Sequence, residues 1–224
     1  MNEIIRKRKS IRKYSMTPLG NDILAMIRSE IENIKPLFDN IEYSIEIGGT
    51  AKGLFGVTAP HYLLFFSEEK EGFLLNIGYI GEKISLFLSE NEIGSCWLGA
   101  VKPLKEGPYP FVIGMAFGLA NEEIFRNDSD FKRKPLSKIS EGDDPRLEAA
   151  RLAPSAMNLQ NWYFIATNGK IHCHIKKGDS ASRLRLIDLG IALAHISTES
   201  ESFTFIKEEN IPEVGKFKYI GTVI

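Results

Sequence analysis

The feature of this sequence that most constrains its fold is a long segment of helical periodicity with two glycines inside it. From Glu69 to Asn91, apolar residues recur every three or four positions, and Gly94 follows as a C-terminal stop. A helix with this pattern is buried over most of its surface. Gly78 and Gly81 lie in its interior, and each costs about 1 kcal/mol relative to alanine. We therefore expect another backbone to pack closely against this helix, with a ligand as the alternative neighbour.

Helical and strand-like patterns alternate along the rest of the chain. Three further helices are predicted, at Asn21–Ile34, Asp144–Leu152 and Leu184–Thr198. Four strands rich in β-branched and aromatic residues are predicted, at Ile41–Ile47, His61–Phe66, Phe111–Leu119 and Phe217–Ile224. The clearest hairpin is Trp162–Lys176, because Asn168 and Gly169 tolerate the positive φ angles of a type I′ turn. This mixture predicts an α+β fold.

The composition excludes several classes of protein. With 224 residues, 43% of them hydrophobic, the chain can bury a large core. Its 28 lysines and arginines against 29 acidic residues argue against coating nucleic acid or an anionic membrane. No apolar run approaches the roughly 20 residues of a membrane-spanning helix, and no secretory signal is recognisable. Cys96 and Cys173 lie in apolar segments, as buried thiols of a reducing compartment do, so we expect a cytoplasmic protein.

The chain also contains a faint internal repeat. Three pairs of similar short segments occur in the same order: one pair ends at Pro36 and Pro154, one surrounds Gly81 and Gly190, and one surrounds Gly114 and Gly221. We therefore predict two half-domains, residues 1–126 and 144–224, joined by a polar crossover or linker at residues 127–143. Chance similarity between helices of one α+β protein is the alternative explanation.

Familiar catalytic motifs are missing from the sequence. The Gly-rich segment Gly48–Gly53 is not a P-loop, because Leu54 and Phe55 follow its last glycine where a P-loop has Lys and Ser or Thr, and a hairpin connection is expected here. His172 and His174 would face away from Cys173 on a strand, so this triplet cannot bring three ligands to a metal ion. No nucleophile elbow of the G-x-S-x-G type is present. We predict no metal site and no hydrolysis by a side-chain nucleophile.

Two polar clusters remain, and the first is the basic segment Arg6–Tyr14. If this segment is extended, Arg8, Ser10 and Arg12 project from one side. Two guanidinium groups and a hydroxyl can hold a phosphate. The apolar Ile11 between them would face the core, which argues against a freely solvated basic terminus.

The second cluster is Ala153–Phe164, where a helix ends at a proline and a short polar loop leads into a strand. Pro154 offers a flat apolar surface. Ser155, Asn158 and Gln160 offer donors and acceptors that suit a polar heterocycle.

Together the two clusters resemble motifs of the FMN-dependent nitroreductase family, whose members open with an R-x-S-x-R-like arm and carry an A-P-S-x-x-N-x-Q-P-W-like loop. Glu92–Pro103 is similar to the segment that runs beneath the flavin in that family, and Phe131–Leu136 (FKRKPL) is similar to its phosphate-contacting R-x-P-L signature. The sequence departs from the family in two ways. Asn161 replaces the usual proline, and the A-P-S loop follows the R-x-P-L signature instead of preceding it.

The repeat accounts for the altered order. Ordinary family members are homodimers in which one subunit supplies the arm and the other supplies the loop. Here the first half has the arm, but Leu37 and Glu42 replace the Ser and Gln of its own loop, whereas the second half has the intact loop and no arm. The chain thus resembles the smaller subgroup of nitroreductases that are fused pseudo-dimers. This resemblance implies a mainly antiparallel central sheet flanked by helices, two pseudo-symmetric halves, and a monomer or a weak homo-oligomer with one complete flavin site.

The resemblance further implies FMN as the cofactor and NAD(P)H as the hydride donor. The implied FMN-binding residues are Arg8, Lys9, Ser10, Arg12, Leu98, Gly99, Arg133, Pro154, Ser155, Asn158 and Gln160. Among them, Arg8, Ser10 and Arg133 would hold the phosphate, and Arg12 would favour the reduced flavin through its charge. The loop would line the ring and the ribityl chain. No catalytic side chain is expected, because the hydride chemistry belongs to the flavin.

The implied activity is hydride transfer through flavin to a nitroaromatic, a quinone or a similar small acceptor. A dehalogenase, an ene-type reductase and a flavin-degrading enzyme are alternatives on the same fold. A non-catalytic flavin-binding module is an alternative of another class. A nucleic-acid binder that uses the basic arm is a third reading, disfavoured because no recognition motif accompanies the arm.

Overall fold

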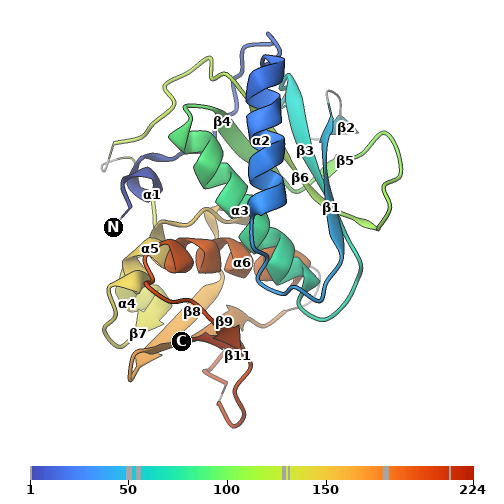
Figure 1. Cartoon of the computed structure of the whole chain (residues 1–224). Helices are drawn as coiled ribbons and strands as arrows, with labels where there is room; N and C mark the ends of the chain where they lie inside the picture. Colours follow the sequence, from blue (N-terminus) through green and yellow to red (C-terminus); the bar gives the residue numbers. More distant parts are fainter. Residues whose placement is uncertain are drawn as a thin grey trace. The chain divides into compact units, whose positions relative to one another are not determined.

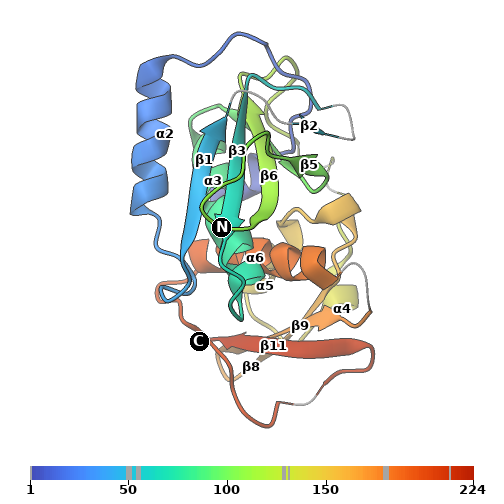
Figure 2. The ribbon, with the colours of Figure 1, turned by 90° about the vertical axis from the view of Figure 1, so that its right-hand side faces the viewer.

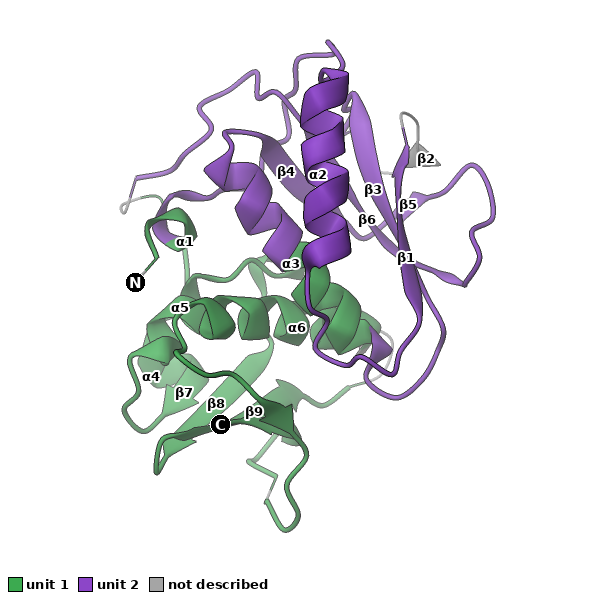
Figure 3. Cartoon of the chain, viewed as in Figure 1, with its two compact units in different colours: residues 1–5, 74–82, 129–224 green, residues 6–73, 83–128 purple. Residues whose placement is uncertain are grey.

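The computed structural model describes all residues except 1, 49–51, 54–56, 128–129, 131, 179–181 and 212. The chain forms two compact units (Figure 3). Unit 1 comprises Met1–Ile5, Leu74–Glu82 and Ser129–Ile224, and unit 2 comprises Arg6–Phe73 and Lys83–Asp128. The segment Gly48–Gly53, read above as a hairpin connection, lies partly outside the described residues.

Unit 2 is built on a four-stranded antiparallel sheet in the order β1-β3-β6-β4 (Figure 1). Its strands are β1 (Tyr43–Gly48), β3 (His61–Ser67), β6 (Phe111–Gly118) and β4 (Gly94–Leu98). The central β3 is buried along its whole length, as its nearly continuous apolar sequence requires. Helix α2 (Asn21–Asn33) runs alongside the sheet (Figure 2), and the short strands β2 (Lys52–Gly53) and β5 (Val101–Lys102) pair with each other.

Unit 1 contains a five-stranded sheet in the order β10-β11-β9-β8-β7. Its strands are β10 (Phe205–Ile206), β11 (Phe217–Val223), β9 (Lys170–Lys176), β8 (Trp162–Thr167) and β7 (Ser140–Glu141). Pairing is antiparallel except between β7 and β8. Helices α5 (Arg146–Leu152) and α6 (Ser182–Thr198) lie on one face of this sheet (Figures 1 and 2), and α4 (Leu136–Ile139) precedes β7. Two helices have residues in both units: α1 (Glu3–Lys7) and α3 (Phe73–Glu90).

Two glycines let α3 and α6 cross closely within unit 1. A Cβ atom at Gly78 would lie 2.2 Å from the carbonyl oxygen of Ile187, and a Cβ atom at Gly190 would lie 2.2 Å from that of Leu75. The close backbone expected at Gly78 is therefore confirmed. Each glycine thus faces the carbonyl of the residue three positions before the other glycine. A two-fold relation between the two helices would give such reciprocal contacts. They pair Gly190 with Gly78, whereas the sequence repeat paired it with Gly81. The fused pseudo-dimer stays a prediction.

The predicted α+β fold with antiparallel sheets flanked by helices is confirmed, although the strands form two main sheets instead of one. The predicted hairpin is β8–β9, whose turn residues have φ angles of 50° at Asn168 and 73° at Gly169. The sequence reading missed β4, and it missed α4 and β7 inside the predicted linker, because these elements are too short to show a period. Among the described residues, no helix has both the length and the apolar character needed to cross a membrane.

Candidate functional site

The basic arm is attached to unit 2 through β4. Ser10 forms a parallel bridge with Ser95, and the amide of Ile11 donates a hydrogen bond of 2.9 Å to the Ser95 carbonyl. Ile11 is fully buried, as predicted, and the Tyr14 hydroxyl donates to the Ile11 carbonyl at 2.6 Å. The arm is therefore part of the folded unit and not a solvated terminus.

The side chains of the arm differ strongly in exposure. Arg8 is only 2% exposed, and its Nη2 donates to the Ser10 hydroxyl at 3.5 Å. Arg12 is exposed, and its amide donates to Glu122 Oε1 at 2.8 Å. Lys9 and Ser10 are half-buried. The arm thus presents the Arg12 guanidinium to solvent and keeps the Arg8 guanidinium inside.

Strand β4 lies within Glu92–Pro103, the segment predicted to run beneath the flavin, and it pairs with the arm. The strand carries Ser95 and ends at the half-buried Leu98, and the exposed Gly99 follows in a turn. Burial raises the pKa of the Cys96 thiol on this strand, while the positive charges of Arg12 and Arg8 lower it. Six of the predicted residues therefore lie in unit 2, on the arm and at the end of β4: Arg8, Lys9, Ser10, Arg12, Leu98 and Gly99.

The predicted loop lies in unit 1 and has a strained backbone. Pro154 is buried after the end of α5, and a single 3-10 turn follows. Met157, Asn158 and Gln160 have positive φ angles of 49°, 56° and 46°. Non-glycine residues in this region are costly and persist only where the surrounding structure holds them, which is typical of functional sites. Met157 is also 84% exposed, although its side chain is apolar.

Hydrogen bonds within the loop hold this conformation. The Ser155 hydroxyl accepts from the Gln160 amide at 3.0 Å. Gln160 is 2% exposed, and its Nε2 donates to the Asn158 carbonyl at 3.0 Å and to Asn158 Oδ1 at 3.2 Å. The amide of Lys134 donates to Gln160 Oε1 at 2.8 Å. The Gln160 side chain therefore supports the loop from within.

The segment that resembles the R-x-P-L signature runs beside this loop. Nε and Nη2 of Arg133 donate to the Leu152 carbonyl at 3.3 and 3.2 Å, and its Nη1 donates to Asn158 Oδ1. Asn158 Nδ2 in turn donates to the Lys132 carbonyl at 2.6 Å. Burial and then the positive charges of Lys176 and Lys216 lower the pKa of the neighbouring Lys134. Phe131, the first residue of the segment Phe131–Leu136, lies outside the described residues.

Unit 1 thus brings together the other five predicted residues. These are Arg133, Pro154, Ser155, Asn158 and Gln160. The segment that resembles the R-x-P-L signature and the loop that resembles the A-P-S motif are separate in the sequence. Direct hydrogen bonds between residues 132–134 and 158–160 join them in the structure.

The sequence reading missed a buried carboxylate beneath the loop. Asp188, on α6, is 4% exposed, and its Oδ1 accepts from the Ala156 amide at 2.9 Å. Burial raises the pKa of this carboxyl to about 7, although the Ala156 hydrogen bond lowers it. The signal was present, since Asp188 interrupts an apolar helix between Ile187 and Leu189.

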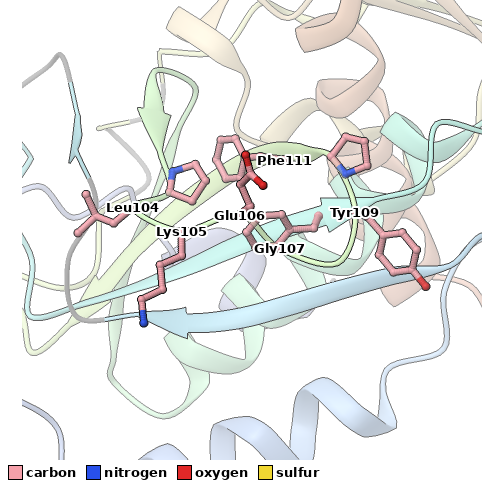
Figure 4. Close-up of a pocket in the computed structure, with 9 residues that line it drawn as sticks. Leu104, Lys105, Glu106, Gly107, Tyr109 and Phe111 are labelled. Carbon is pink, nitrogen blue, oxygen red and sulfur yellow. The ribbon is translucent and has the colours of Figure 1, made fainter.

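A pocket of about 430 Å³ lies elsewhere in unit 2 (Figure 4). It is lined by Phe66 on β3, by Phe111 at the start of β6, and by residues of the chain between β5 and β6: Pro103, Leu104, Lys105, Glu106, Gly107, Tyr109 and Pro110. None of the predicted FMN-binding residues lines it.

Comparison with solved structures identifies the fold of this protein. Over 99% of its length the chain is similar to a structure from Thermotoga maritima MSB8 described as a "putative nitroreductase", with 24% sequence identity, a TM-score of 0.67 and 90% of that chain covered. The protein therefore has the nitroreductase fold. An FMN-dependent nitroreductase from Clostridium difficile R20291 is also similar, at 17% identity over 58% of this chain and 93% of that chain, with a TM-score of 0.46.

A family model then makes the assignment specific. The model described as "Putative TM nitroreductase" matches residues 1–200, and the chain belongs to this nitroreductase family. Among proteins with curated descriptions, none matched the chain.

Proposed function

We propose that this protein is an FMN-dependent oxidoreductase that accepts hydride from NADH or NADPH and passes electrons to a small acceptor such as a nitroaromatic or a quinone. The observation that supports this most is the construction of the loop in unit 1. Its strained residues are hydrogen-bonded to the segment that resembles the phosphate signature, in a chain of the nitroreductase family. A strained and well-anchored polar loop is typical of a binding site.

The residues present suit FMN on the basis of their chemistry. The proposed phosphate ligands are the arm residues Arg8 and Ser10 together with Arg133, because guanidinium and hydroxyl groups donate to phosphate oxygens. Arg12 is exposed and offers a permanent positive charge to the flavin. Lys9 adds a second cation, and the backbone at Leu98 and Gly99 is the proposed neighbour of the reactive part of the ring.

The loop would line the ring and the ribityl chain with Pro154, Ser155 and Asn158. Gln160 was expected to reach the edge of the ring. Because its side chain is buried and hydrogen-bonded to Asn158 and to Lys134, its proposed contribution is now to shape the loop. Bound FMN would supply the hydride chemistry, so the protein side chains are needed to bind and orient and not to act as acid or base.

The visible spectrum of freshly purified protein, before and after addition of NADH or NADPH without oxygen, tests this proposal. Flavin absorption bands that bleach with either nicotinamide, and return with a nitroaromatic or a quinone, are the expected result. Bands that persist with both donors would instead identify a non-catalytic flavin-binding module. A colourless protein that takes up no FMN would overturn the proposed function.

A further inference from the structure

Asp188 is the one side chain of α6 that forms a hydrogen bond with the strained loop in the described part of unit 1. It lies in a buried stretch of the helix between Ile187 and Leu189. Its Oδ1 accepts from the Ala156 amide, and no ion pair with a cation is found for it among the described residues. Burial of a carboxylate with only a backbone partner is costly, so its presence at this position calls for a role.

The loop needs an anchor of this kind. Three of its non-glycine residues have left-handed backbone conformations, at Met157, Asn158 and Gln160. The hydrogen bonds described above come from the loop itself or from residues 132–134. Asp188 differs from them because it belongs to a buried helix, and it holds the loop at Ala156, immediately before the first strained residue.

The helix crossing also distinguishes Asp188 from its counterpart in α3. Gly78 and Gly190 occupy reciprocal positions at the crossing, so the residue two positions earlier is Asn76 in α3 and Asp188 in α6. The carboxylate is thus found in the half with the intact A-P-S loop, and a neutral amide takes its place in the half whose loop is degraded. This difference associates the charge with the loop and not with the helix crossing.

From these observations we infer that Asp188 is a positioning residue of the FMN site. Its carboxylate fixes the Ala156 amide and thereby holds the backbone of Pro154–Gln160 in the conformation that receives the flavin. This inference rests on the proposed function, because the loop is assigned to FMN there.

Three variants test the inference. Asp188→Ala removes the acceptor, and Asp188→Asn keeps an oxygen that can accept from the Ala156 amide. Leu189→Ala is the matched control, because Leu189 is the fully buried neighbour on the same helix and its truncation destabilises the core without removing the anchor.

Two measurements are made on each variant. Hydrogen exchange of the Ala156 amide in flavin-free protein reports the anchor itself, independently of any function. The Kd for FMN, measured by flavin titration, reports the consequence for binding. We expect Asp188→Ala to speed the exchange and raise the Kd about tenfold, because the Ala156 amide loses its acceptor and the loop loses its attachment to α6. Asp188→Asn should keep the Kd within about threefold of wild type and should not speed the exchange.

The possible failures are distinguishable. If wild type binds FMN and Asp188→Ala binds it equally well, or if Leu189→Ala raises the Kd as much as Asp188→Ala does, the inference is wrong and the proposed function stands. Unchanged exchange at Ala156 in Asp188→Ala also overturns the inference. If wild type binds no FMN, the proposed function fails, and the FMN role of Asp188 fails with it.

Discussion

Met157 combines two unfavourable properties at a single residue. Its side chain is almost fully exposed, and its φ angle of 49° is one that only glycine and asparagine adopt readily. We expect Met157→Gly to raise the free energy of unfolding by about 1 kcal/mol, because relief of the left-handed strain outweighs the added entropy of the unfolded chain. Urea denaturation of the flavin-free protein measures this change.

Asn168→Gly is the matched control for that variant. Asn168 has nearly the same φ angle, 50°, but lies in the β8–β9 turn and is a residue that tolerates this conformation. Asn168→Gly should therefore change the free energy of unfolding by less than Met157→Gly does. An equal gain in both variants would show that the loop around Met157 carries no special strain.

Asp188 makes the stability of the protein depend on pH. Burial raises the pKa of its carboxyl from 3.8 to about 7, so the folded state binds this proton more tightly than the unfolded state does. The stability that the protonated carboxyl supplies is complete below about pH 4 and is lost as the pH rises towards 7.

Asp188→Asn cannot ionise and should not suffer this loss. Relative to wild type, its free energy of unfolding should rise between pH 4 and 7 and then level off. The total rise should be at most about 4 kcal/mol, because each unit of the pKa shift corresponds to about 1.36 kcal/mol. Thermal or urea melts of both proteins across this range measure the difference. A difference that stays constant with pH would mean that Asp188 titrates near its usual value.

At the scale of elements, the sequence predicts the long helices and strands but not the short ones. Segments such as α3 and α6 contain several turns of apolar periodicity, and each main strand carries enough β-branched and aromatic residues to be recognised. Strand β4 has five residues and α4 has four, which is too little for a period to appear. These short elements matter for the site, because β4 anchors the arm and α4 follows the segment beside the loop.

The sequence identifies candidate residues for a site, but not how each side chain is used. Motif resemblance selected Gln160, yet only hydrogen-bond geometry shows that its side chain supports the loop. Likewise, both Gly78 and Gly81 are visible in the sequence, but a tertiary contact with Ile187 identifies the one at the helix crossing. Asp188 was overlooked because an aspartate in a helix is usually assigned to its solvent face.

At the scale of the whole molecule, the proposal makes a prediction about stoichiometry. The predicted FMN ligands are divided between the two units, with the arm in unit 2 and the loop in unit 1. If both sets serve a single cofactor, the protein should bind one FMN per chain, and substitution in either set should weaken that one binding event. Arg12→Ala and Asn158→Ala provide the test, because both side chains are exposed and their truncation leaves the core intact, although Asn158→Ala also removes the hydrogen bonds of the loop to Lys132 and Arg133.

We expect each of these two variants to raise the Kd for FMN about tenfold, because each removes a charge-assisted or polar contact with the cofactor. The stoichiometry should remain one FMN per chain. Lys13→Ala is the control for charge, since Lys13 is the exposed cation next to Arg12 and points the other way if the arm is extended. Lys13→Ala should leave the Kd for FMN within about twofold of the wild-type value. Isothermal titration of the flavin-free protein gives both quantities at once. Two FMN molecules per chain, with each variant weakening only one of them, would show that the arm and the loop serve separate sites.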